Sequence, residues 1–179
     1  MTLYIFEDKT PLVADNSFLH PQATVIGAVT IGSHCFIGPG AVLRGDLGTI
    51  EVGDGTNIQD NCVIHADREV IIGQNIIIGH GAIIHDAVLK TGVVVGMGAI
   101  LMNGVVAEED VIIGAGSLVK ENFKIPPRKI VVGNPGRIVK EIDEEGKKKV
   151  VSGLKCYQGL TERYRKGMQP VKVDDPVKS

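Results

Sequence analysis

The sequence predicts an all-β fold, a left-handed parallel β-helix of hexapeptide repeats, followed by a C-terminal α-helix. Three observations lead to this prediction: a six-residue period, a composition poor in bulky side chains, and one amphipathic segment near the end. The 179 residues include 23 glycines, three tyrosines, four phenylalanines and no tryptophan. A core built from such small and branched side chains must be narrow.

The six-residue period begins after His20 and extends over about 100 residues, which outweighs any local propensity. In each repeat an aliphatic residue is followed by a small or polar one, and a small side chain comes four residues after the aliphatic one. One repeat makes one side of a prism and three make a coil, so each coil buries the apolar face of its neighbour. The inward aliphatic residues are Ile31, Ile37, Leu43, Val52, Ile58, Ile64, Ile72, Ile78, Ile84, Leu89, Val95, Leu101, Ala107 and Ile113.

We divide the chain into a β-helix domain over residues 1–136, a helix packed on the prism over 137–168, and a loose tail over 169–179. The first 18 residues should form an extended lead-in with a turn at Lys9-Thr10-Pro11. The repeat is expected to end after Val119, where a turn-rich connection follows.

The period also breaks within the β-helix. Residues 43–52 and 64–72 run longer than one repeat, so we expect loops that bulge from the corners of the prism there.

The C-terminal segment has apolar residues at steps of three and four, the pattern of an amphipathic helix. Gly153 and Gly159 weaken an isolated helix by roughly 1 kcal/mol each. The helix should therefore lie against the prism. Its apolar positions are Val150, Leu154, Tyr157, either Leu160 or Thr161, and Tyr164.

Composition excludes several classes of partner. A net charge of −2 offers no basic stripe for nucleic acid or an anionic membrane. No segment approaches the ~20 apolar residues that span a bilayer, and the N-terminus lacks the regions of a signal peptide. The odd number of cysteines, without C-x-x-C, indicates a reduced, cytoplasmic compartment. Cys35 and Cys62 hold the small-residue position, so we expect them to pack in the core.

The histidines carry the main functional signal. His65 and His85 hold the same repeat position on successive coils, and Arg44 holds it one coil earlier. Their imidazoles should therefore stack at one coil spacing of ~4.8 Å, which suits two ligands of one metal ion. His80 falls on a different side of the prism. A cyclic trimer would bring it to the pair of a neighbouring subunit and complete a three-histidine zinc site.

Other polar residues near this pattern have candidate roles. Arg44, Asp46 and Asp60 are expected to form an intersubunit salt-bridge cluster that fixes the trimer. Gln59 follows the inward Ile58 and is a candidate to hydrogen-bond water on the metal. His20 and His34 show no pattern that predicts a function.

A known family shares these motifs. The chain reads R-G-D at 44–46, N-I-Q-D at 57–60, His65, and G-H-x-x-x-x-H at 79–85, and in this it resembles the γ-class carbonic anhydrases. It resembles more closely the branch with the phenylacetate-degradation Y and carnitine-operon E proteins, which share S-F-x-H-P at 17–21 and a Y-Q pair at 157–158.

The resemblance implies a homotrimer that hydrates CO₂ reversibly with hydroxide supplied at zinc, or at cobalt or ferrous iron. It implies metal ligation by His65 and His85 of one subunit and His80 of the next, with Gln59 orienting the hydroxide. It also implies that Tyr157, on the C-terminal helix, reaches toward the metal.

The sequence departs from the most active family members in its acidic residues. Leu47 follows Asp46, and the loop after His65 offers only Asp67 and Glu69 for proton transfer, so we expect modest or absent hydratase activity. Thioester hydrolysis at the same metal, CoA-dependent acyl transfer, and a role as a binding or assembly module remain alternatives. Acyl transfer would not require three histidines in matching frame.

Overall fold

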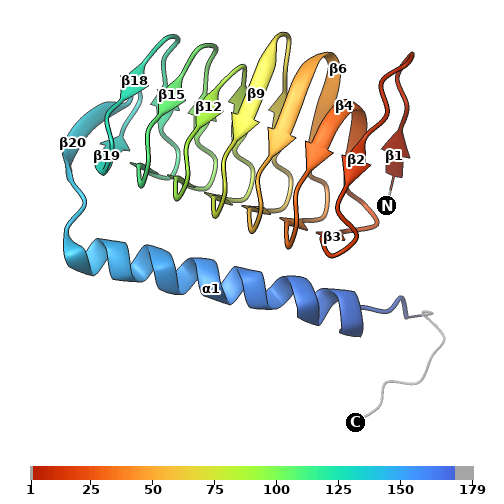
Figure 1. Ribbon diagram of the computed structural model, residues 1–179. Helices are drawn as coiled ribbons and strands as arrows, with labels where there is room; N and C mark the ends of the chain where they lie inside the picture. The colour runs from red at the N-terminus through yellow and green to blue at the C-terminus, as the bar shows by residue number, and fades with distance from the viewer. Residues whose placement is uncertain (1, 172–179) are drawn as a thin grey trace.

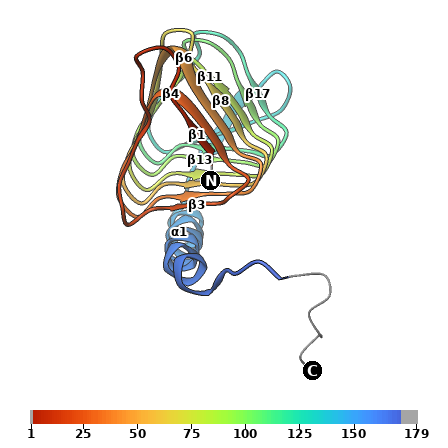
Figure 2. The same cartoon turned by 90° about the vertical axis from the view of Figure 1, so that its right-hand side faces the viewer.

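The computed structural model describes residues 2–171 and confirms the predicted parallel β-helix with one C-terminal helix along it (Figure 1). Viewed along its axis, the β-helix has a three-sided outline with the helix against one side (Figure 2). The chain passes through the three sides in a fixed order, which we number first, second and third. Helix α1 lacks the apolar length needed to cross a membrane.

The first side is one sheet of short parallel strands, each pairing with its counterparts one coil before and after. These strands are β3 (Phe18–Leu19), β5 (Phe36–Ile37), β7 (Asn57–Ile58), β10 (Ile77–Ile78), β13 (Val94–Val95), β16 (Ile112–Ile113) and β19 (Lys129–Val132). At the C-terminal end, β20 (Arg137–Glu141) pairs antiparallel with β19.

The second and third sides form one continuous sheet because two long strands turn the corner between them. These long strands are β4 (Thr24–Ile31) and β6 (Val42–Val52). The second side further holds β1 (Thr2–Tyr4), β8 (Val63–His65), β11 (Ile83–His85), β14 (Ile100–Leu101) and β17 (Leu118–Val119). The third side further holds β2 (Leu12–Val13), β9 (Glu69–Ile72), β12 (Val88–Leu89), β15 (Val106–Ala107) and β18 (Lys124–Ile125).

The core is the stack of inward aliphatic residues that the period predicts. Ile37, Ile58 and Ile78, for example, are fully buried on successive coils of the first side. Cys35 and Cys62 are fully buried among them, as expected. Burial raises the pKa of the Cys62 thiol to about 11, so this side chain packs as a small apolar group.

The outward residues differ between the sides. On the second side they form a ladder of aliphatic residues in register, which we call the aliphatic ladder. It consists of Val42, Val63, Ile83, Ile100 and Leu118. Val63 and Ile83 are 40% and 39% exposed. On the third side the corresponding ladder has polar residues toward both ends, including Thr30, Glu51 and Lys124.

Helix α1 (Glu144–Gly167) covers the first side, where it contacts β3, β5 and β7 (Figures 1 and 2). The carboxylate of Asp143 caps its first turn by accepting a hydrogen bond from the Gly146 N–H at 2.7 Å. Near its other end the Tyr164 ring packs on Phe18 and Phe36, with centroids 5.3 and 5.2 Å away. Thr161, the second of the two alternatives, is the buried residue.

Several expected boundaries differ from those observed. The lead-in already forms β1 and β2, and its turn follows Phe6, whose backbone bonds to that of Lys9. The repeat does not end after Val119, because β18 and β19 continue the coil. These strands lack the pattern of earlier coils, in which a small side chain comes four residues after the aliphatic one. The six-residue period therefore did not predict them.

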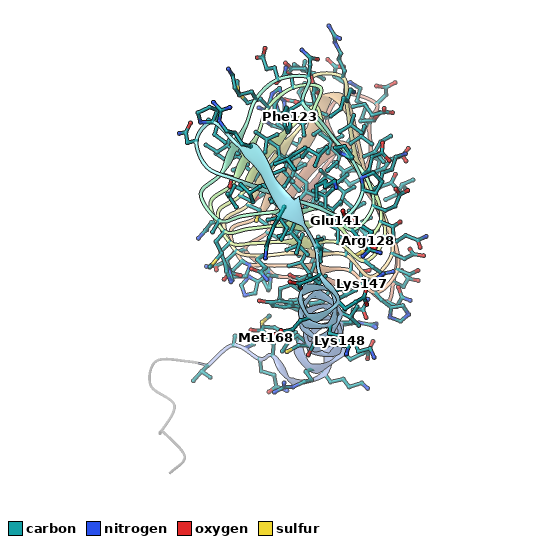
Figure 3. The ribbon with its side chains drawn as sticks, turned by 90° about the vertical axis from the view of Figure 1, so that its left-hand side faces the viewer. Phe123, Arg128, Glu141, Lys147, Lys148 and Met168 are labelled. Atoms are coloured by element: carbon teal, nitrogen blue, oxygen red, sulfur yellow. The ribbon has the colours of Figure 1, made fainter. Side chains whose placement is uncertain are left out.

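The region expected to be helical over 137–168 begins with β20 instead, and the helix starts only at Glu144. Figure 3 shows β20 crossing the open end of the prism before the chain enters α1. The expected tail over 169–179 shows no helix or strand as far as residue 171, and its remainder lies outside the described residues.

Of the two expected corner loops, only one forms. Residues 66–68 connect β8 to β9 as a short loop, whereas residues 43–51 belong to the continuous strand β6. Two glycines permit that corner. A Cβ at Gly27, which has φ +76°, would collide with the Gly45 carbonyl oxygen on the neighbouring coil.

Candidate metal centre

His65 and His85 lie side by side at the corner between the second and third sides, which we call the His65 corner. They end strands β8 and β11 and are direct partners in the ladder. Their ring centroids are 4.9 Å apart, and His65 Nδ1 lies 3.0 Å from His85 Nε2. Arg44 is the ladder partner of His65 on the preceding coil. The predicted placement of the two imidazoles at one coil spacing is therefore confirmed, although the rings meet edge to face, with their planes 68° apart, rather than stacked.

Asp46 fixes the orientation of His65. Its Oδ1 lies 3.1 Å from His65 Nε2, and its Oδ2 accepts a 2.6 Å bond from Arg44. Desolvation alone would raise the pKa of Asp46, but hydrogen bonds from Arg44, His65 and the Leu47 N–H outweigh it and lower the pKa to about 2. An ionised carboxylate only accepts hydrogen bonds. His65 Nε2 therefore carries the hydrogen, and Nδ1 presents a lone pair toward His85.

The environment of His85 completes the pair. Its Nδ1 is buried without a hydrogen-bond partner among the described residues, and Asp86 Oδ2 lies 4.0 Å from it. Within the chain alone, His85 Nε2 donates a hydrogen bond at 3.0 Å to the lone pair of His65 Nδ1. With the hydrogen of His85 on Nδ1 instead, both facing nitrogens present lone pairs to one cation. These two residues therefore fit a metal ion such as zinc.

Asp67 is the third donor at this corner. Its Oδ1 lies 3.7 Å from His65 Nδ1 and 3.9 Å from His85 Nε2, the same two nitrogens that face each other. These three side chains are grouped closely enough to share one cation. Glu69, the other candidate for proton transfer, belongs to β9 and is exposed.

His80, Gln59 and Asp60 lie at the opposite edge of the second side, which we call the Gln59 corner. The backbone N–H of His80 donates to Gln59 Oε1 at 3.1 Å, and His80 Nδ1 lies 3.0 Å from Asp60 Oδ2. Gln59 is buried, whereas the His80 side chain is 47% exposed. His80 follows β10 of the first side, so it is separated from the His65 corner, as the sequence predicted.

Arg44 and Asp46 pair with each other within one chain, and Asp60 pairs with His80. Their expected role in an intersubunit cluster stays a prediction. Tyr157 is half-buried on α1, which covers the first side and not the His65 corner, so its expected approach to the metal stays a prediction.

Sequence reasoning missed one support of this site and underrated another. Lys9, from the turn that follows Phe6, donates a hydrogen bond from its Nζ to the Asp46 carbonyl at 2.6 Å, and no spacing in the sequence signals that contact. Asp67 stood out only as an acidic residue after His65. Its convergence with both histidines depends on the shape of the loop over 66–68.

Comparison with known proteins places this geometry in a family. The family model described as bacterial transferase hexapeptide (six repeats) matches residues 10–45. The carnitine operon protein CaiE of Proteus sp. (strain LE138) is 38% identical over 170 residues, which cover 94% of this chain and 86% of that protein. The mitochondrial gamma carbonic anhydrase 2 of Arabidopsis thaliana is 40% identical over 90% of this chain, but the match spans only 61% of its length.

Solved structures agree with the fold. A hexapeptide transferase family protein from Anaplasma phagocytophilum is 36% identical, with a TM-score of 0.89 over 91% of this chain and 98% of that one. The N-acyltransferase AntD from Bacillus cereus is 20% identical with a TM-score of 0.68, a likeness of fold alone. The chain therefore belongs to the hexapeptide-repeat family together with CaiE, and γ-class carbonic anhydrases are among its relatives.

Proposed function

We propose that this protein is a trimeric metalloenzyme of the γ-carbonic anhydrase type that hydrates CO₂ reversibly and with low activity. The observation that carries the proposal is the pair of facing nitrogens of His65 and His85, preset by Asp46 and by the register of β8 and β11. Zinc is the cation that we assign, with cobalt or ferrous iron as the alternatives. The odd, free cysteines favour a reduced, cytoplasmic compartment for it.

The trimer is supported by the chemistry of the second side. The aliphatic ladder exposes apolar surface between the His65 corner and the Gln59 corner. Packing three such sides around an axis would bury the ladder and place one corner of each subunit against the other corner of its neighbour. His80 of the partner subunit would then complete the ligand set of His65 and His85.

The side chains at the two corners have distinct tasks in this proposal. A cation held here acts as a Lewis acid that supplies hydroxide near neutral pH. Arg44 and Asp46 hold His65 in one tautomer, so that its Nδ1 faces the cation. Gln59 is fixed through its Oε1, and its Nε2 is the group that we assign to orient the hydroxide that attacks CO₂. Tyr157 stays a candidate for the far wall of the pocket.

Low activity follows from the residues available to carry protons. Leu47, directly after Asp46, is 64% exposed and cannot accept a proton. Of the two acidic residues after His65, Asp67 already lies against the histidines, and Glu69 points from the next strand. Proton export would therefore depend on buffer, and hydration should be slow compared with efficient anhydrases.

The test is the metal content of gently purified protein, measured by elemental analysis for wild type and for His80→Ala, together with the mass of the assembly. We expect about one metal per subunit in a trimeric wild type, a clear loss in His80→Ala with the trimer retained, and slow CO₂ hydration only in metal-loaded protein. His34→Ala, which changes an exposed histidine hydrogen-bonded to Asn16, is the matched control and should keep the metal.

Two results would contradict the proposal. Absence of metal after anaerobic preparation and reconstitution would remove the metalloenzyme and leave acyl transfer or scaffolding. Bound metal with thioester hydrolysis but no CO₂ hydration would retain the site and reject the reaction.

A further inference from the structure

We infer that Asp67 is a further protein ligand of this metal centre, supplied by the same subunit as His65 and His85. The inference rests on the proposed metal site. It adds the Asp67 carboxylate as a donor, which would occupy one further coordination position of the metal ion. Its starting point is the triangle formed by His65 Nδ1, His85 Nε2 and Asp67 Oδ1, with sides of 3.0, 3.7 and 3.9 Å.

The size of this triangle matches a metal ion. Bonds of roughly 2.0–2.2 Å at tetrahedral angles would separate the ligand atoms of zinc by about 3.3–3.6 Å. The three sides of the triangle lie on both sides of this range, so small side-chain rotations would let His65, His85 and Asp67 hold one cation.

The backbone on both sides of Asp67 is anchored, so the position of its Cα follows from the fold. The Ala66 carbonyl accepts a bond from the Gly48 N–H at 2.9 Å. The Arg68 carbonyl accepts one from the Thr49 N–H at 3.0 Å, and the Arg68 N–H donates to Asp86 Oδ1 at 2.9 Å. The fold therefore carries the Cα of Asp67 to the His65 corner, within reach of both histidines.

The other acidic residues at this corner do not compete for this role. Asp46 lies on the far face of the His65 ring, against Nε2, and is held by Arg44. Among residues 2–171, the Asp67 carboxylate has ion-pair contacts with His65 and His85 alone. With the cation bound, Asp67 neutralises one of its charges, which two imidazoles cannot do.

The consequence is a site with three donors in one subunit and a fourth, His80, from the partner subunit. Catalytic zinc sites keep a position open for solvent or substrate, whereas sites filled by four protein ligands are structural. A cation held by Asp67 as well would therefore be open to substrate only when the Asp67 carboxylate points away. Its side chain is 49% exposed, so it can swing into solvent without disturbing the core.

The test is a titration of the metal-free full-length trimer with Co²⁺, read by chelator competition and by visible absorption of the bound ion. The variants are Asp67→Asn and Asp67→Ala, with Glu69→Gln as the control for charge in the same segment. We expect both Asp67 variants to bind Co²⁺ at least about tenfold more weakly and to change its absorption spectrum. Glu69→Gln should match wild type, and CO₂ hydration per bound metal should rise in Asp67→Asn.

The outcomes separate this inference from the proposed function. If wild type and both Asp67 variants bind Co²⁺ with the same affinity and spectrum, Asp67 is not a ligand, and the three-histidine site still stands. If Glu69→Gln weakens binding as much as Asp67→Asn, the effect is one of general charge and ligation is rejected. If wild type binds no Co²⁺ at all, the proposed metal site and the role of Asp67 fail together.

Discussion

The first and second sides of the prism have similar strands but differ in what covers their outer surface. Both present rows of apolar residues outward, yet the first side is covered by α1 of the same chain, with Tyr164 packed on Phe18 and Phe36. No helix or strand of residues 2–171 covers the second side (Figure 2), although Val63 and Ile83 lie in the middle of its ladder. The second side needs a cover from outside the chain.

The candidate site follows the same division. Both of its corners lie at edges of the uncovered second side. The Gln59 corner also borders the first side, which α1 covers, and the His65 corner also borders the third side. At the His65 corner the paired Asp46 and His65 are 18% and 11% exposed, so this pair is organised within one subunit. At the Gln59 corner the pair of His80 and Asp60 is 47% and 40% exposed. The His80 pair and Asp67, which is 49% exposed at the His65 corner, are therefore the groups open to a neighbouring subunit.

The largest effect should come from placing a charge on the uncovered side. Ile83→Asp puts a carboxylate in the centre of the aliphatic ladder, where burial without a partner costs several kcal/mol per subunit. We expect the trimer to dissociate to monomers, measured by light scattering coupled to gel filtration. Val106→Asp makes the same change on the third side and should leave a trimer. A trimeric Ile83→Asp protein would show that the second side is not the interface.

The next effect concerns the two corners. Asp46→Asn removes the carboxylate that fixes the tautomer of His65, and loss of such a partner weakens metal binding about 10–100-fold. Asp60→Asn should cost less, because its pair with His80 is half exposed and screened by solvent. Metal affinity from chelator competition measures both. Equal losses would mean that the corners are equally organised before assembly, contrary to the difference seen here.

Much of this arrangement could be predicted from the sequence because a β-helix repeats its geometry. The period placed His65 and His85 in one ladder and put His80 on another side, since each coil repeats the position of the one before. The strands β18 and β19 were not predicted because their own residues do not show the repeat pattern. Pairing with β15 and β16 of the preceding coil holds them in the β-helix. The approach of Asp67 and of Lys9 to the site depends on loop and hairpin shape, which no period describes.

A smaller effect is expected on the covered side. Tyr164→Ala removes the ring that packs α1 on Phe18 and Phe36. We expect the free energy of unfolding to fall by about 2 kcal/mol. This loss is smaller than for a buried aromatic residue because Tyr164 is 37% exposed. Urea denaturation measures this. Tyr164→Phe keeps the ring and should be neutral. The trimer should survive both changes, and its dissociation in Tyr164→Ala would mean that α1 also supports the interface.

The smallest effect tests how tightly the prism itself is closed, whatever covers its sides. Burial raises the pKa of Cys35 and raises that of Cys62 to about 11, whereas Cys156 is exposed on α1. Because the thiolate is the reacting species, iodoacetamide at pH 8 should label one thiol per native chain, Cys156, and three in denaturant. Cys156→Ser should abolish native labelling, and mass spectrometry of the intact protein counts the adducts.

The same thiols give the sign of a pH effect. The folded state favours the protonated form of Cys62, so its contribution to stability is complete below the ordinary pKa of 9.0 and is lost as pH rises from there toward about 11. The free energy of unfolding should therefore fall over that alkaline range. The fall should be smaller in Cys62→Ala, when each protein is compared with its own value below pH 9. Rapid labelling of Cys62 in the native protein at pH 8 would instead show that the coils open readily. The stacked core would then be as accessible to reagents as the exposed second side.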